Sequence, residues 1–320
     1  MTKIKSLAKI IINNLRNYLG LNDSEKISSD FKNFCNQFEI QIEEAIITYN
    51  EKISAYNKDI EFLNTYREND IRSKIDVLGK FLNKFGNLPQ NINFCEENKK
   101  ELHKLHKETF VKIKELIDLA TPKKIFFYYS LLDIIITKIF IQTTNIELKM
   151  VYEKFKLSAK EALRIEKNEE KYCELEIEIL RMYIKTLQDI SKSIERDIIP
   201  ELSLVEAFFE AKYINNLVIT GEIVKTEINF PEKYNLLAIK DTKYCKYYTF
   251  VKNVYLFMIL VVEIYSSTIL SRLFERNTQE EIEDITKDQL KEKREDKKLL
   301  LKQRKMIRDI VIKIGKSKNG

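Results

Sequence analysis

The amino-acid sequence predicts an all-α protein built from long helices, and two observations support this prediction. Only six Gly and four Pro occur in 320 residues, so turns are scarce and helices are favoured. The 77 residues between Pro122 and Pro200 contain neither Gly nor Pro. As a single helix they would be about 115 Å long. The sequence therefore predicts a long-helix bundle or coiled-coil hairpin, with one small β-hairpin near residues 217–229.

Residues 1–121 are predicted to form an N-terminal helical region. Apolar residues in steps of three and four predict a long helix over Asp30–Tyr66, with further helices at Val77–Phe85 and Glu96–Ala120. The stretch Thr2–Leu19 has one apolar face and no acidic residue. It fits either a helix docked on the bundle or a helix at a membrane surface. Lysines interrupt this stretch, so no classical signal peptide is expected.

No motif in the sequence predicts catalysis. The two histidines, His103 and His106, belong to no recognised metal motif. The six glycines are too scattered for a phosphate-binding loop. Four widely spaced cysteines without a CxxC pair indicate free thiols. We therefore expect a protein that is not an enzyme and uses no cofactor, metal or small-molecule substrate.

Residues 122–315 are predicted to form a long-helix hairpin with its tip at 200–240. Its first arm contains an apolar segment, Ile125–Ile141, for which a buried core helix is favoured over a membrane span because two charged residues lie within it. A seam of apolar residues follows from Leu148. The polar run Glu166–Lys171 predicts a bend or an exposed middle, which leaves both a rod-like coiled coil and a folded-back hairpin open. The second arm is Asp241–Gly315, and residues 316–320 are expected to fray.

The predicted tip contains two breaks in the helical pattern. Pro200 is expected to end the long helix, because proline removes a backbone donor and clashes with the preceding turn. A shorter helix is expected over Glu201–Asn215. Beyond it, β-branched residues on both sides of Gly221 predict the β-hairpin.

A second apolar segment lies within residues 247–274. Asn253–Ser271 carry Glu263 as their only charged residue, a length and composition that suit a membrane-spanning helix. A carboxylate near the centre of such a span is costly, so a buried core helix is the favoured interpretation and membrane insertion the alternative. The candidate residues of this membrane or core segment are Tyr247, Tyr248, Leu256, Phe257, Ile259, Leu260 and Glu263.

The C-terminal segment is basic. The chain carries a net charge of +6, and residues 287–318 hold thirteen Lys or Arg against five Asp or Glu. Part of this asymmetry suits the dipole of a helix that begins acidic and ends basic. A polyanion is the alternative partner. The candidate polyanion contacts are Lys297, Lys298, Lys302, Arg304, Lys305 and Arg308.

These observations favour a non-catalytic, elongated α-helical protein that acts through helix–helix association, with membrane contact through 247–274 as an option. The expected partner is another protein or a second copy of the chain. An α-helical membrane-inserting or pore-forming protein is one alternative. A nucleic-acid-binding protein is a less favoured one, because acidic residues alternate with the basic ones. The expected location is the cytoplasm, or a membrane as a peripheral or integral protein.

Overall fold

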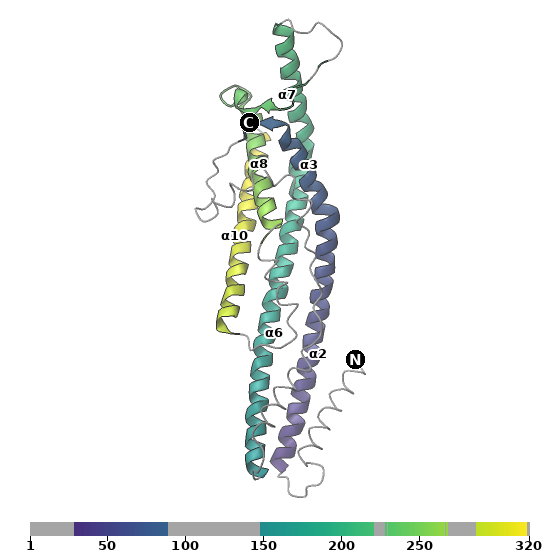
Figure 1. Cartoon of the computed structure of the whole chain (residues 1–320), viewed down its shortest axis with the longest axis vertical. Coiled ribbons are helices and arrows are strands. Elements are labelled where there is room, and N and C mark those ends of the chain that lie inside the picture. Colours follow the sequence, from purple (N-terminus) through teal and green to yellow (C-terminus); the bar gives the residue numbers. More distant parts are fainter. Residues whose placement is uncertain are drawn as a thin grey trace. The chain divides into compact units, whose positions relative to one another are not determined.

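The computed structural model describes residues 29–88, 148–220, 228, 230–265, 267 and 286–318 (Figure 1). In these residues the protein is all-α, as predicted, apart from one sheet of two very short strands. The helices predicted over Thr2–Leu19, Glu96–Ala120 and Ile125–Ile141 lie outside the described residues, as do both histidines. The coiled coil stays a prediction.

The first described stretch is one continuous helical segment. It begins with α2 (Ser29–Tyr66), passes through the π-helical turn η1 (Arg67–Ile71) and ends with α3 (Arg72–Asn83). The predicted helix Asp30–Tyr66 is thus confirmed to within one residue at its start. Its apolar stripe is buried at the positions that the periodicity indicates, including Phe38, Ile53 and Leu63.

The second continuous segment joins α6 (Leu148–Ser193), the π-helical turn η3 (Ile194–Ile198) and α7 (Ile199–Thr220). Of the two alternatives predicted for Glu166–Lys171, the bend is wrong, because α6 runs through this stretch without a break. The exposed middle is found in part, since Lys167 and Lys171 are exposed. Glu166 itself is buried although it carries a carboxylate. The seam is confirmed at its described apolar positions, which are buried, among them Ala159, Leu180 and Leu187. The seam position Glu169 is half-buried.

Pro200 does not end this segment, contrary to the prediction. The turn η3 precedes the proline, and the Ile199 N–H donates to the carbonyl of Ile194, five residues back. A π-turn is wider than an α-turn, so the ring of the proline and its missing N–H are accommodated without breaking the helix. Helix α7 therefore extends to Thr220.

The predicted β-hairpin near 217–229 is wrong for its first residues, because Leu217–Thr220 are the last turn of α7. The helix continues a segment that is already formed, and this outweighs the weak strand preference of four β-branched or apolar residues. Instead, β1 (Phe85–Gly86) pairs in parallel with β2 (Tyr234–Asn235). The pairing brings Phe85 to 5.0 Å from Phe209 of α7, measured between ring centroids.

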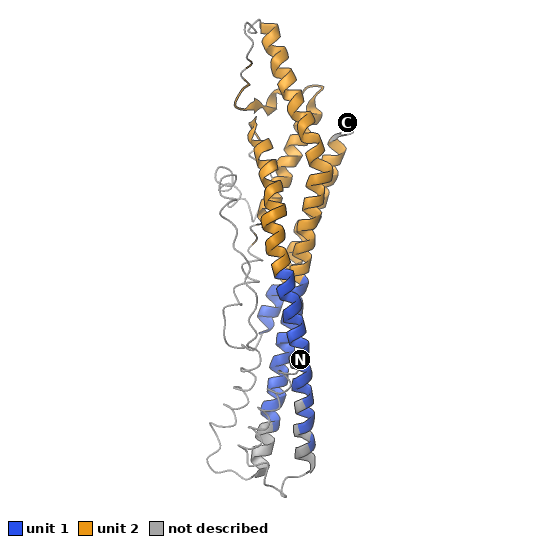
Figure 2. Ribbon diagram, turned by 90° about the vertical axis from the view of Figure 1, so that its right-hand side faces the viewer, with its two compact units in different colours: residues 1–60, 121–178, 274–294 blue, residues 61–120, 179–273, 295–320 orange. Residues whose placement is uncertain are grey.

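The described residues form two compact units (Figure 2). Unit 1 comprises 29–60, 148–178 and 286–294, and unit 2 comprises the rest. The predicted division into 1–121 and 122–315 stays a prediction. Each unit combines segments from both ranges.

Ion pairs join the helices of unit 1. The Lys52 Nζ lies 2.7 Å from both Glu170 Oε1 and Glu174 Oε1. Glu176 is fully buried, and its Oε1 lies 3.5 Å from the Nζ of Lys293 in α10 (Lys287–Lys318). The Lys293 ammonium also lies 5.2 Å from the ring centroid of Tyr172. Both lysines thus hold α6 to a neighbouring helix.

Unit 2 has α8 (Cys245–Tyr265) in its core, preceded by the short 3-10 helix η4 (Leu236–Ile239). Twelve of the twenty-one residues of α8 are buried, including Phe257 and Leu260. Helix α3 packs on α8, and α10 supplies buried Ile307 and Ile310. Helix α10 continues to Lys318, three residues beyond the predicted boundary at 315.

Because Phe257 is fully buried in unit 2, Phe257→Ala should lower the free energy of unfolding by about 3–5 kcal/mol. The exposed Ile312 is the matched control, and Ile312→Ala should change the stability by less than about 0.5 kcal/mol. Urea-induced unfolding followed by circular dichroism measures both. Equal effects of the two substitutions would contradict a core position for α8.

Candidate functional site

The predicted membrane or core residues all lie on α8, and the structure separates them into two groups. Phe257 and Leu260 are buried, whereas Tyr247, Tyr248, Leu256, Ile259 and Glu263 are half-buried. Tyr247 stacks on Phe208 of α7 with 4.2 Å between ring centroids. The Gln303 Nε2 of α10 donates to Glu263 Oε1 at 3.1 Å. Glu263 is therefore a hydrogen-bonded carboxylate at the edge of the core of unit 2.

Helix α8 is also the one helix in the described part of the chain that is long and apolar enough to cross a membrane. Length and composition alone support this, and the core helix of a soluble protein meets the same criteria. Membrane contact through 247–274 stays a prediction. It would require the buried side chains of α8 to leave unit 2.

The C-terminal end of α8 receives donors from two other segments. The Tyr183 hydroxyl of α6 donates to the Ile264 carbonyl at 3.0 Å, and the Arg67 Nη2 of η1 donates to the Tyr265 carbonyl at 3.1 Å. The Arg67 guanidinium also lies 4.6 Å from the centroid of the Tyr265 ring. A cation at this place complements the negative end of the helix dipole. Burial raises the pKa of Tyr183, so its hydroxyl keeps the proton that it donates.

A second polar group connects the two π-turns. The Lys74 Nζ lies 2.6 Å from Asp70 Oδ1 of η1 and 2.7 Å from Glu195 Oε1 of η3. It also donates to the Ser191 hydroxyl of α6. Burial alone would lower the pKa of Lys74, but its hydrogen bonds to Asp70 and Glu195 outweigh burial and raise it. The ammonium therefore stays charged between its two carboxylates.

The pKa of the Asp70 carboxyl is shifted so that Asp70 is also charged. Burial works to raise its pKa, but hydrogen bonds from Lys74 and Ser191 outweigh burial and lower the pKa below the ordinary value. Asp70 and Lys74 are thus an ion pair whose charged form the fold favours. The sequence shows their i,i+4 spacing, which is typical of helical ion pairs, but not the third partner Glu195 on the other segment.

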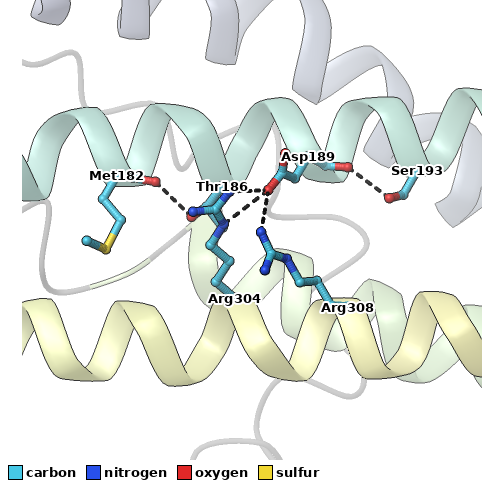
Figure 3. A network of polar contacts seen from close by, with 6 residues as sticks. All are labelled: Met182, Thr186, Asp189, Ser193, Arg304 and Arg308. Atoms are coloured by element: carbon cyan, nitrogen blue, oxygen red, sulfur yellow. Dashed lines mark hydrogen bonds and ion pairs between the residues drawn. The ribbon is translucent and has the colours of Figure 1, made fainter.

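The predicted polyanion contacts lie along α10, and the structure assigns two of them to Asp189 of α6 (Figure 3). The Arg304 Nε and Nη2 lie 3.0 and 2.6 Å from Asp189 Oδ2, and the Arg308 Nη2 lies 3.8 Å from the same oxygen. Lys298, Lys302 and Lys305 are exposed, whereas Lys297 is half-buried. Part of the basic character of the C-terminal segment thus balances an internal carboxylate.

Helix α7 carries a group of exposed residues that the sequence pattern did not indicate. Three of its residues, Leu202, Val205 and Phe209, are buried. On the other side of the helix the side chains are exposed, to 60% at Leu204 and 59% at Val218. The exposed residues recur in steps of three and four, and the periodic pattern Leu204, Ala207, Ala211, Asn215 and Val218 contains no charge. We call these five residues the α7 stripe.

The α7 stripe is not apparent in the sequence, because the predicted helix ends at Asn215 and the residues beyond it favour a strand. With α7 extended to Thr220, Val218 joins the same helical side as Leu204, since fourteen residues make almost four turns. The signal in the sequence is the absence of charge at these spacings. It is informative in a chain with 32% charged residues.

In the described part of the chain, no group of three or more His, Cys, Asp or Glu side chains is placed to hold a metal ion. What the described residues offer is ion pairs between helices and one uncharged helix side. Comparisons of the chain with protein-family models, with curated proteins and with solved structures each found no match.

The ion pair of Asp70 predicts a pH dependence. Because the folded-state pKa of Asp70 is lowered, its stabilisation is present above the ordinary carboxylate pKa and is lost as the pH falls through the lowered value. Asp70→Asn should therefore lower the free energy of unfolding at pH 7, and the difference from the wild type should shrink below about pH 4.

Urea-induced unfolding at several pH values measures this difference. Exposed Glu68 in the same π-turn provides the control, and Glu68→Gln should have a smaller effect at pH 7. An Asp70→Asn difference that stays constant down to pH 2.5 would contradict the assignment.

Proposed function

We propose that the protein is a non-catalytic helical protein that acts through helix–helix association, and that it associates through the α7 stripe. The observation that carries this proposal is the exposed, uncharged side of α7. A helix of a soluble protein normally presents polar and charged residues to solvent, whereas the α7 stripe presents Leu204 and Val218 at its two ends. Exposed apolar residues grouped on one helix side are typical of a surface that another protein covers.

The composition of the stripe suits a helical partner. Small side chains at Ala207 and Ala211 allow two helix axes to approach closely, and steps of three and four residues match the packing of one helix on another. A polar residue such as Asn215 within an apolar seam favours one register over others. Ile219, exposed to 74%, extends the apolar surface beside the stripe.

The spacing also favours a second copy of the chain as the partner. The stripe is symmetric about Ala211, with Leu204 and Val218 seven residues away on either side and Ala207 and Asn215 four residues away. An antiparallel pair of α7 helices would place Leu204 against Val218 of the partner and Ala211 against the partner's Ala211. Such a two-fold contact uses the same surface on both chains and closes as a dimer.

Sedimentation velocity over a concentration series tests this function. One helix pair gives a small interface, so the wild type should dimerise weakly, with a dissociation constant on the order of 10 µM. Leu204→Glu should weaken the dimer by about tenfold or more, because each glutamate loses water beside an apolar residue. Ile312→Glu on α10, also at an exposed apolar position, should leave the dimer intact.

A charge pair tests the antiparallel arrangement. Adding Val218→Lys to Leu204→Glu should restore much of the dimer, because each glutamate then meets a lysine of the partner. A wild type that stays monomeric up to about 200 µM, well above the expected dissociation constant, would overturn the proposed self-association. Equal losses from Leu204→Glu and Ile312→Glu would overturn the assignment to α7.

A further inference from the structure

The two π-turns of unit 2 are linked through one lysine. Turn η1 lies between α2 and α3, and turn η3 lies between α6 and α7. In each turn a backbone N–H donates to the carbonyl five residues back, from Arg72 to Arg67 and from Ile199 to Ile194. Lys74 binds Asp70 in the first turn and Glu195 in the second. Single π-turns within α-helices are uncommon and are often associated with function.

Turn η3 has a local cause in the sequence. Pro200 lies two residues after the end of this turn and has no N–H to donate. In a regular α-helix its ring would clash with the carbonyl four residues back. The wider π-turn relieves this clash. Substituting the proline would remove the reason for the turn without removing any side-chain contact of Lys74.

Turn η1 has no such local cause. Its sequence, Arg-Glu-Asn-Asp-Ile, contains neither Pro nor Gly, and every one of its residues is compatible with an ordinary α-turn. Its contacts are instead tertiary. Arg67 binds the end of α8, and Asp70 reaches Glu195 of η3 through the ammonium of Lys74.

We infer that η3 sets the hydrogen-bond register of η1, and that Lys74 is the positioning residue that connects them. Pro200 fixes η3, η3 places Glu195, and Glu195 with Asp70 fixes Lys74 on α3. Without this connection residues 67–71 can adopt an α-turn. The one-residue change in register would rotate α3 by about 100° relative to the end of α2.

Such a rotation would move side chains that are now in the core. Ile75, Leu78 and Leu82 of α3 are fully buried, and α3 leads directly to β1 and the ring of Phe85. Packed interfaces of this kind have discrete alternative arrangements and do not deform continuously. The paired π-turns are thus a conformational device with two registers for α3, and the bound Lys74 selects the observed one. This inference is independent of self-association through α7.

Hydrogen–deuterium exchange followed by mass spectrometry tests the direction of the coupling on the full chain. Lys74→Met should speed exchange in peptides covering 67–75 by about tenfold, with peptides covering 194–200 changed by less than about twofold. Pro200→Ala should change exchange in both regions, because the loss of η3 removes the partner of Lys74.

Lys52→Met is the matched control, because Lys52 also binds two carboxylates but on a regular part of α2. It should leave both regions unchanged. Glu195→Gln keeps the size of the side chain and should repeat the effect of Lys74→Met. Peptides from α8 report whether unit 2 stays folded in each variant.

Equal changes in both regions on Lys74→Met would overturn the inference, since the two turns would then open together as one block. No change in either region on Lys74→Met would also overturn it. So would a Pro200→Ala variant in which residues 67–75 keep their wild-type exchange.

Discussion

The arrangement of unit 2 depends on how the buried C-terminal end of α8 is satisfied. The last carbonyls of a helix have no partner within it, and burying them without donors is costly. Tyr183 and Arg67 supply these donors from α6 and η1. Arg67, the first residue of η1, is 3% exposed and brings a charge into the core. Its guanidinium must therefore keep its contacts with the end of α8 and with the ring of Tyr265. The position of the π-turn and the cap of α8 are therefore one constraint.

Other charged side chains in the structure are likewise paired with a group on another segment. Lys74 and Arg304 each lie against carboxylates of another segment, and both contribute to unit 2. In unit 1, Lys293 and Glu176 are both buried and lie close to each other. Removing one member of such a pair leaves a buried charge behind, which costs more than the pair itself contributes. Some basic residues of the C-terminal segment thus form ion pairs within the fold. The α7 stripe, in contrast, is exposed and carries no charge.

Much of the helical architecture could be predicted from the sequence, because apolar residues in steps of three and four mark buried helix faces. The π-turns could not. The buried residues Leu63, Arg67 and Ile71 form two consecutive steps of four at η1, and Ile194, Ile198 and Leu202 do so at η3. The same double step at Glu169, Cys173 and Ile177 lies in regular α-helix. Two consecutive steps of four therefore do not by themselves predict a π-turn. Tertiary contacts or a following proline must also be known.

The candidate sites were harder to predict, for a related reason. Arg67, Lys74 and Asp189 act through partners more than a hundred residues away in the chain, and one sequence does not show such pairs. The basic pattern along α10 predicts polyanion contacts for Arg304 and Arg308, because the sequence of this helix alone does not show their partner Asp189. The α7 stripe required the true end of α7, which Pro200 and the β-branched residues before Gly221 obscured.

A double-mutant cycle on Arg67→Leu and Tyr183→Phe tests the central constraint most directly, with the free energy of unfolding measured in urea. Both side chains donate to the Tyr265 carbonyl, at 3.1 and 3.4 Å. We expect Arg67→Leu to cost about 1–3 kcal/mol and the two substitutions to be non-additive by about 0.5 kcal/mol or more. An Arg67→Leu variant as stable as the wild type, with additive effects in the cycle, would contradict the account.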